Sequence, residues 1–144
     1  MEKTINFLMD EEHERLGFLL DKFEKTLEKD VEIAKKIFNH FKWSLEKHFF
    51  VEENAIFYVY ESVIGEEVSV IFDLMKEHGE IIELIKKIEI NLDKGNEINV
   101  QILREKLEAH SKFEDDIFYP RLDEELEAEK KQEIIEKINV LVRS

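Results

Sequence analysis

A histidine followed four residues later by a glutamate occurs twice in this chain, as His48 with Glu52 and as His110 with Glu114. Residues four apart lie on one face of an α-helix, one turn above each other. Each pair can therefore offer an imidazole nitrogen and a carboxylate oxygen to the same point in space. Two such pairs facing each other predict a dinuclear metal site inside a bundle of helices.

Residues that break helices are rare, since the 144-residue chain contains one proline and four glycines. Charged residues make up 39% and apolar residues 43% of the chain, a mixture suited to long amphipathic helices around a buried core. This length predicts a single domain that covers residues 1–144. Cysteine is absent, which excludes disulfides, thiol catalysis and cysteine-ligated clusters.

Hydrophobic periodicity predicts five helices. They cover about residues 4–29, 31–60, 66–92 and 99–120, with a more polar fifth at 123–142, and the intervening loops include residues 61–65 and 93–96. Thr4 and Asp30 are the expected N-caps of the first two helices, and Asn96 or Asn99 that of the fourth. Pro120 should stop or kink the fourth helix. Long helices joined by short loops predict an all-α, up-down-up-down antiparallel four-helix bundle with a short C-terminal fifth helix.

Each of the four long helices carries a histidine on its inward apolar stripe: His13, His48, His78 and His110. The apolar members of these stripes are Met9, Leu16, Leu20, Phe23 and Leu27; Ile37, Phe41, Leu45, Ala55 and Val59; Ile71, Met75, Ile82 and Ile85; Leu103, Leu107 and Ile117. When positions are counted outward from the predicted loops at 1.5 Å per residue, the four histidines fall in one layer. Glu52 and Glu114 both lie one turn beyond that layer, on the same side.

The two inward glutamates need a compensating charge. Burying an unpaired carboxylate among apolar residues costs several kcal/mol, and the stripes offer no lysine or arginine near Glu52 or Glu114. One or two bound cations would remove this cost. Imidazole and carboxylate donors without a thiolate suit iron, manganese or zinc. The His-Glu-x-x-His arrangement of zinc peptidases is absent. The predicted metal ligands are His13, His48, Glu52, His78, His110 and Glu114.

This pattern resembles the hemerythrin family, the His-His-Glu cation-binding domains. The resemblance extends from His13 to about Leu122, and its carriers are EEHERL, HFFVEENAIF, KEHGEI and HSKFEDDIFYP. It implies a four-helix bundle with a non-haem di-iron centre on the same six residues. The expected cofactor is therefore two iron ions with an oxo or hydroxo bridge, and manganese or zinc is less favoured.

Two positions depart from the oxygen-carrying members of that family. Those members have a second histidine one turn after the first in the third helix, where this chain has Ile82. They also have a bridging aspartate five residues after the fourth-helix histidine, and Asp115 has that spacing. Glu114 lies about 40° from His110 around an ideal helix and Asp115 about 140°. Glu114 is therefore the preferred bridging ligand, and Asp115 is the second choice.

The resemblance implies binding of a small diatomic ligand, dioxygen or nitric oxide, at an open iron position. The protein would then be a carrier, store or scavenger rather than an enzyme. The set of four histidines and two glutamates is also similar to di-iron proteins that repair iron–sulfur clusters and handle nitric oxide. The alternatives are thus a di-iron oxidoreductase acting on nitric oxide or peroxide, or an iron donor for cluster repair. A third hypothesis is an interaction module whose acidic surface recruits a partner around a structural metal.

Net charge and hydropathy limit the classes of partner that this chain is expected to bind. The net charge of −14 argues against binding to nucleic acid or to an anionic membrane. The start of the chain, MEKTINFLMDEEHERL, lacks the apolar core of a signal peptide. No apolar run approaches the roughly 20 residues that a bilayer crossing needs. The expected location is the cytoplasm.

Four further residues near the motifs are expected to have structural or solvent-exposed positions rather than a direct role at the site. His40 is expected at the surface or half buried, with a part in ligand access as the alternative. Glu53 could support the site from outside, but solvation is preferred. Tyr58 and Tyr119 follow the two motifs at similar distances. They are expected as core residues at helix ends, and hydrogen bonding near the site is the alternative.

Overall fold

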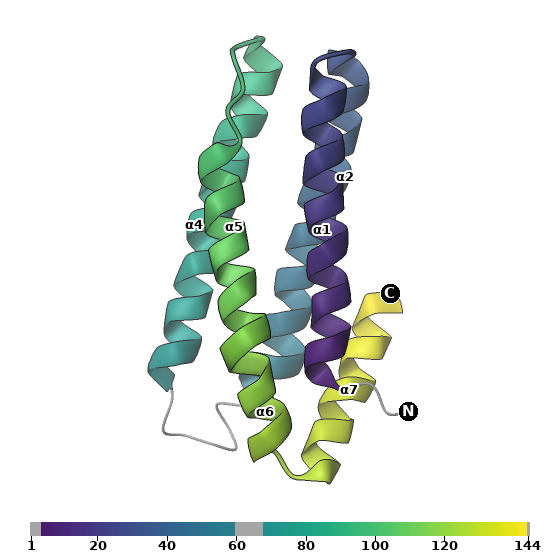
Figure 1. Cartoon of the computed structure of the whole chain (residues 1–144), viewed down its shortest axis with the longest axis vertical. Coiled ribbons are helices and arrows are strands. Elements are labelled where there is room, and N and C mark those ends of the chain that lie inside the picture. Colours follow the sequence, from purple (N-terminus) through teal and green to yellow (C-terminus); the bar gives the residue numbers. More distant parts are fainter. Residues whose placement is uncertain (1–3, 60–67, 144) are drawn as a thin grey trace.

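Four long helices form two antiparallel hairpins that lie side by side (Figure 1). The structure, a computed structural model, describes residues 4–59 and 68–143. Its elements are α1 (Ile5–Leu27), α2 (Val31–Val51), the π-helical segment η1 (Glu52–Phe57), α4 (Val68–Lys94), α5 (Gln101–Phe113), the π-helical segment η2 (Glu114–Phe118), α6 (Tyr119–Glu125) and α7 (Ala128–Arg143). Helices α1 and α2 form one hairpin, α4 and α5 form the other, and α7 packs against the first (Figure 1).

The predicted all-α bundle with a short C-terminal helix is confirmed for the described residues. The predicted loop at 61–65 and the first residues of the predicted third helix lie outside them. Thr4 and Asp30 cap α1 and α2 as expected, since each side chain accepts a hydrogen bond from the amide three residues later, at 3.0 and 3.1 Å. Asn99 accepts from the first amide of α5 at 2.9 Å. Gly95 ends α4 with φ +71°, a conformation that glycine adopts without strain.

A polar layer divides the core into two apolar clusters. One cluster includes Met9, Val51, Ala55, Leu74 and Phe118, and the other includes Leu16, Leu45, Phe49, Ile81 and Leu107. On α1 the boundary falls between Met9 and Leu16, the interval that contains His13. The corresponding intervals of α4 and α5 contain His78 and His110, and on α2 His48 directly precedes Phe49 at the edge of the second cluster. The layer predicted from the helix stripes is therefore closed off by apolar side chains on both sides.

Two details of the predicted stripes are wrong. Met75 is 45% exposed, and Leu74, one residue earlier, is buried in the core instead. Either position fits the helical spacing of the other inward residues, so the sequence pattern alone did not distinguish them. Ile117 is 48% exposed and Phe118 is buried. The i→i+5 hydrogen bonds of η2 take more residues per turn than an α-helix, so the inner face returns one residue later. Pro120 does not stop the helix, because α6 continues directly from η2.

The C-terminal part of the bundle is held by polar contacts. Helix α7 begins after α6 rather than near Asp123, which lies in α6. The carboxylate of Asp123 accepts hydrogen bonds from the amides of Ile5 and Asn6, both at 3.1 Å. Lys47 donates to the carbonyl of Val142 at 2.7 Å. Within residues 4–59 and 68–143, no helix combines the length and apolarity that crossing a membrane requires.

Candidate metal centre

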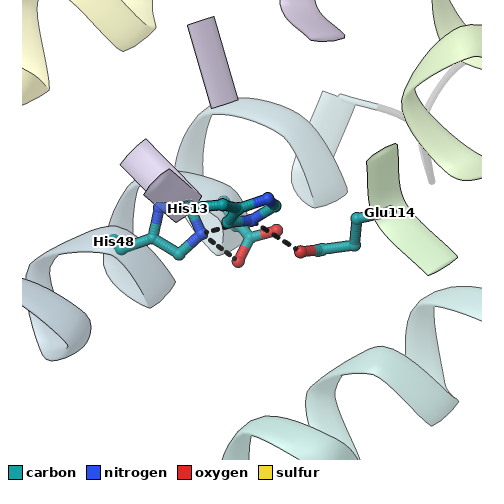
Figure 2. Close-up of side chains that lie close together, drawn as sticks. His13, His48 and Glu114 are labelled. Carbon is teal, nitrogen blue, oxygen red and sulfur yellow. Dashed lines mark hydrogen bonds and ion pairs between the residues drawn. The ribbon is translucent and has the colours of Figure 1, made fainter. Parts of the chain in front are cut away.

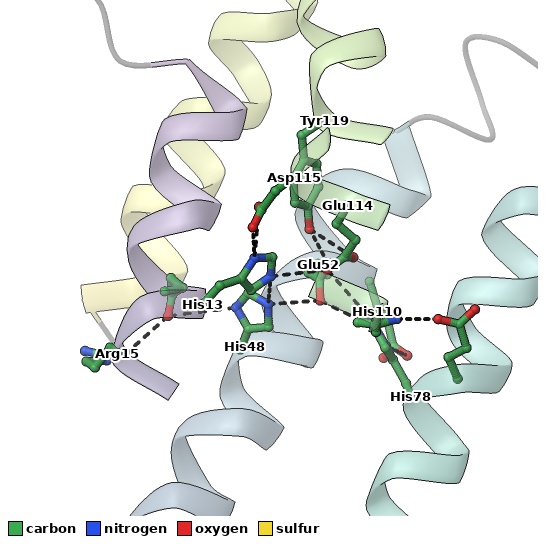
Figure 3. Close-up of polar contacts among 12 residues, drawn as sticks. His13, Arg15, His48, Glu52, His78, His110, Glu114, Asp115 and Tyr119 are labelled. Carbon is green, nitrogen blue, oxygen red and sulfur yellow. Dashed lines mark hydrogen bonds and ion pairs between the residues drawn. The ribbon is translucent and has the colours of Figure 1, made fainter. Parts of the chain in front are cut away.

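Six side chains converge in the polar layer (Figure 3). We call them the inner cluster: His13, His48, Glu52, His78, His110 and Glu114. They form two overlapping donor groups, one with the histidines of α1 and α2 and one with those of α4 and α5, and both groups share the two glutamates. In each group, one donor atom from each residue lies within 4.8 Å of the others. The structure thus brings together the six residues that the sequence singled out.

The first half of the inner cluster joins α1 to α2 (Figure 2). The Nε2 atoms of His13 and His48 are 3.1 Å apart. His48 Nε2 is also 3.1 Å from Glu52 Oε1, and His13 Nε2 is 3.2 Å from Glu114 Oε1. Four donor atoms on four different elements therefore surround one small space.

The second half repeats this geometry between α4 and α5. The Nε2 atoms of His78 and His110 are 3.1 Å apart. They lie 3.3 Å from Glu52 Oε1 and 3.4 Å from Glu114 Oε1, respectively. The rings of each histidine pair have centroids 4.8 Å apart and cross at 68° in both halves. The two hairpins are thus related by a pseudo-two-fold axis, and each glutamate Oε1 lies beside one histidine of each half.

One oxygen of each glutamate, Oε1, has no hydrogen-bond partner among the described residues. Both side chains are fully buried, and Glu52 Oε1 and Glu114 Oε1 accept no hydrogen bond from the described residues. Each atom nevertheless has two imidazole Nε2 atoms within 3.4 Å. Buried carboxylate oxygens without a hydrogen-bond partner, each next to two imidazole nitrogens, match the requirements of a cation bound between them. The residues present therefore fit a metal centre.

Without metal, the pKa values of the two glutamates shift in opposite directions. Burial alone would raise the pKa of Glu52, but attraction to His48 and hydrogen bonding with Glu114 hold this pKa well below its usual value. Burial, reinforced by the charge of Glu52, raises the pKa of Glu114 well above its usual value. Burial also lowers the pKa of His110, which favours the neutral imidazole. A bound cation would displace the proton from Glu114.

Each imidazole of the inner cluster also has a carboxylate beside its second ring nitrogen, Nδ1. We call these acids the outer carboxylates; the pairs are Asp115–His13 (2.9 Å), Glu77–His110 (2.7 Å), Glu53–His78 (3.3 Å) and Glu12–His48 (3.9 Å). Glu12 is the most distant, because its carboxylate also pairs with Arg15 at 3.2 Å. A carboxylate at Nδ1 holds the proton on that nitrogen and leaves the Nε2 lone pair facing inward.

The outer carboxylates form a closed ring around the bundle. Each one comes from the helical run before the histidine that it contacts, in the order α1 to α2, α2 with η1 to α4, α4 to α5, and α5 with η2 back to α1. This follows from helix geometry, because a residue next to an inward one lies about 100° around the helix and faces the neighbouring helix. Hydrogen bonds to the ring orient the imidazoles of His13, His78 and His110, whereas His48 Nδ1 has only the more distant charge of Glu12 beside it.

Two outer carboxylates, Glu12 and Glu77, were not predicted. Their signal in the sequence is the repeated Glu-His pair, since each directly precedes a predicted ligand. Glu53 was expected in solvent but contacts His78. Asp115, the second choice as a bridging ligand, lies at His13 Nδ1 and outside both donor groups.

Glu77→Gln is expected to weaken metal retention by roughly 10- to 100-fold, the usual effect of losing a carboxylate behind a metal-binding histidine. The amide preserves the size of the side chain but not the charge that orients His110. Glu80→Gln is the matched control, because Glu80 lies one turn away on α4 and pairs with Lys106 at the surface. Competition with a chelator measures the effect. Equal retention in both variants would contradict a role for the ring.

The other three residues considered in the sequence, His40, Tyr58 and Tyr119, differ in position and burial. His40 is exposed and stacks beside Trp43 with ring centroids 6.4 Å apart, so the predicted surface position is confirmed. Tyr58 is 69% exposed, and its prediction as a core residue is wrong. Tyr119 is fully buried, and its hydroxyl donates to carboxylates of the inner cluster (Figure 3). For Tyr119, hydrogen bonding at the site, the alternative, is therefore correct.

Comparison with known proteins agrees with this geometry. The family model described as the Hemerythrin HHE cation binding domain matches residues 4–122. The match begins at the N-cap of α1 and ends within α6, so it contains the whole inner cluster and all four outer carboxylates. No curated protein and no solved structure gives a significant match.

Proposed function

The chain belongs to the hemerythrin HHE cation-binding domain family, and on that premise we propose that its inner cluster holds two iron ions and binds a small diatomic ligand. The proposed ligands are His13 and His48 for one ion, His78 and His110 for the other, and Glu52 and Glu114 for both. Iron held by these residues would supply reversible coordination of dioxygen or nitric oxide. The protein would serve as carrier, store or scavenger.

The observation that carries this proposal is the pair of buried Oε1 atoms of Glu52 and Glu114. They accept no hydrogen bond from residues 4–59 and 68–143, yet each faces an imidazole of both halves. Four imidazole nitrogens and two carboxylates without thiolate suit iron, with manganese or zinc as less favoured alternatives. Two nitrogens per ion also leave room for an exchangeable ligand.

Surface cavities support access from the side of His78 and His110. A cavity of about 590 Å³ is lined by His78, Phe49 and Ile82. A second, of about 320 Å³, is lined by His110. The Phe49 ring stacks on His78 with centroids 3.7 Å apart, so an apolar ring screens this histidine from water. A small uncharged ligand would cross such an apolar screen more readily than an ion.

The other residues of the chain keep the centre dry and oriented. The two apolar clusters cover the polar layer from both sides, which strengthens electrostatic interactions within it. The outer carboxylates that hydrogen-bond His13, His78 and His110 at Nδ1 direct Nε2 of these imidazoles inward. The centre is therefore preorganised for metal binding by residues that would not touch the metal.

The test is the optical spectrum of the iron-loaded protein, reduced without oxygen and then exposed to oxygen. We expect new near-ultraviolet and visible bands that disappear when oxygen is removed, over repeated cycles. Irreversible oxidation without a stable adduct would contradict a binder and favour the di-iron oxidoreductase or iron donor. The observation that keeps this alternative is Ile82, which supplies no third nitrogen to the His78–His110 half and so leaves it more open.

A further inference from the structure

The pseudo-two-fold axis pairs Tyr119 with Phe57. The sequence separation between Glu52 and Glu114 is the same as that between His48 and His110. The same separation relates Phe57, the last residue of η1, to Tyr119. The ring of Tyr119 is near-parallel to that of His13, with centroids 6.3 Å apart and planes at 26°. The ring of Phe57 bears the same relation to His78, at 5.7 Å and 25°. The two aromatic residues thus occupy equivalent places, and only one of them carries a hydroxyl.

The hydroxyl of Tyr119 reaches the centre of the inner cluster. Its ring is fully buried, and the hydroxyl donates to Glu52 Oε2 and to Glu114 Oε2, the latter at 3.1 Å. The opposite oxygens of the same carboxylates, the two Oε1 atoms, are those that face the imidazoles. One hydroxyl thus holds the back of both carboxylates, while their other oxygens receive no hydrogen bond from the part of the chain that the structure describes.

We propose that Tyr119 is a positioning residue of the metal centre, whose hydroxyl ties Glu52 and Glu114 together and keeps both Oε1 atoms directed between the two histidine pairs. Without it, each buried carboxylate would lose a hydrogen bond and could rotate about its terminal torsion, which is broad for glutamate. This inference rests on the proposed function, because it concerns the same six ligands. It adds to the outer carboxylates a further residue that shapes the site without binding the metal.

The pseudo-symmetry gives an unusual control. A two-fold rotation exchanges Glu52 and Glu114, so the pair of Oε2 atoms is carried onto itself. A hydroxyl on the ring at position 57 would therefore approach the same two oxygens from the other side. The double variant Phe57→Tyr with Tyr119→Phe should restore what Tyr119→Phe removes, although the hydroxyl then comes from a different helix.

The experiment loads the full chain and both variants with ferrous iron without oxygen, then measures iron content, the rate of iron loss to a chelator and the absorption spectrum after oxidation. We expect Tyr119→Phe to lose iron at least 10-fold faster than the unmodified chain, with shifted bands, and the double variant to return toward the original rate. A loss of packing alone would not be restored by a hydroxyl at position 57. Should Tyr119→Phe not fold, the double variant carries the test, and fast iron loss from it would contradict the inference.

Other outcomes are equally decisive. Iron loss from Tyr119→Phe at the original rate would overturn the inference. A visible phenolate-to-iron band that vanishes in Tyr119→Phe would also overturn it, because Tyr119 would then be a direct ligand. Fewer than two irons in the unmodified chain would defeat the proposed function itself. Two irons there with unchanged release from the variant would defeat only the role of Tyr119.

Discussion

Glu52→Ala and Glu114→Ala are each expected to lose at least one of the two metal ions. The Oε1 atom of each glutamate lies within 3.1–3.4 Å of a histidine from both halves, so either truncation removes a shared oxygen donor and leaves a cavity in its place. Removing a shared ligand weakens the binding of both ions, so the metal content should fall from about two per chain to one or none. Elemental analysis of the purified variants measures this.

His40→Ala is the control for both substitutions. His40 is exposed on α2 and lies outside both donor groups, so this variant should keep two metal ions. The comparison separates loss of a ligand from a general effect of removing a polar side chain. Equal metal content in all three variants would refute the ligand assignment.

Removing the metal should destabilise the protein strongly. The metal-free chain buries two carboxylates side by side, and an uncompensated buried charge costs roughly 3–5 kcal/mol. At about 3 °C per kcal/mol for a chain of this size, Tm should fall by roughly 10 °C after chelation. Thermal unfolding with and without chelator, followed by circular dichroism, measures the change. An unchanged Tm would show that the glutamates do not depend on a cation.

The stability of the metal-free protein should also depend on pH in a defined direction. Because the folded-state pKa of Glu114 is raised, protonated Glu114 stabilises the fold most below its unfolded pKa near 4.5, and this contribution is lost as pH rises through the raised value. Glu52, whose pKa is lowered, contributes above its own unfolded pKa near 4.5 and loses that contribution on acidification. Metal-free stability should therefore decline from mildly acidic toward alkaline pH.

Glu114→Gln tests that explanation. The neutral amide keeps the shape of protonated Glu114, so the metal-free variant should not lose stability as pH rises. At pH 8 it should melt several degrees above the metal-free original, even though it binds less metal. If the stabilities of the two metal-free proteins changed with pH in parallel, the protonation of Glu114 in the metal-free protein would be contradicted.

The inner cluster could be predicted from sequence because its information is local. Four histidines and two glutamates interrupt apolar stripes at helical spacing, and the register of antiparallel helices then brings them together. Ile117 was predicted wrongly because the π-helical hydrogen bonding of η2 does not show in the apolar pattern. Tyr58 and Tyr119 looked alike in sequence, yet one is exposed and the other buried. Their difference depends on one residue of register between η1 and η2.

The outer carboxylates show what sequence reasoning missed and why. Glu77 contacts His110, a residue on another helix, at 2.7 Å. The residue next to Glu77 in sequence, His78, is contacted instead by Glu53. A search for partners within one helix cannot find such pairs, because each acid points across to the adjacent helix. The signal is present only as acids flanking predicted ligands, and the bundle order assigns each acid to its histidine.

The most direct test of the central claim is the metal content of the full chain, purified in air and measured by elemental analysis. The dinuclear centre proposed for the six residues of the inner cluster predicts about two irons per chain. Zinc alone, or no metal in a protein that is fully folded, would contradict it.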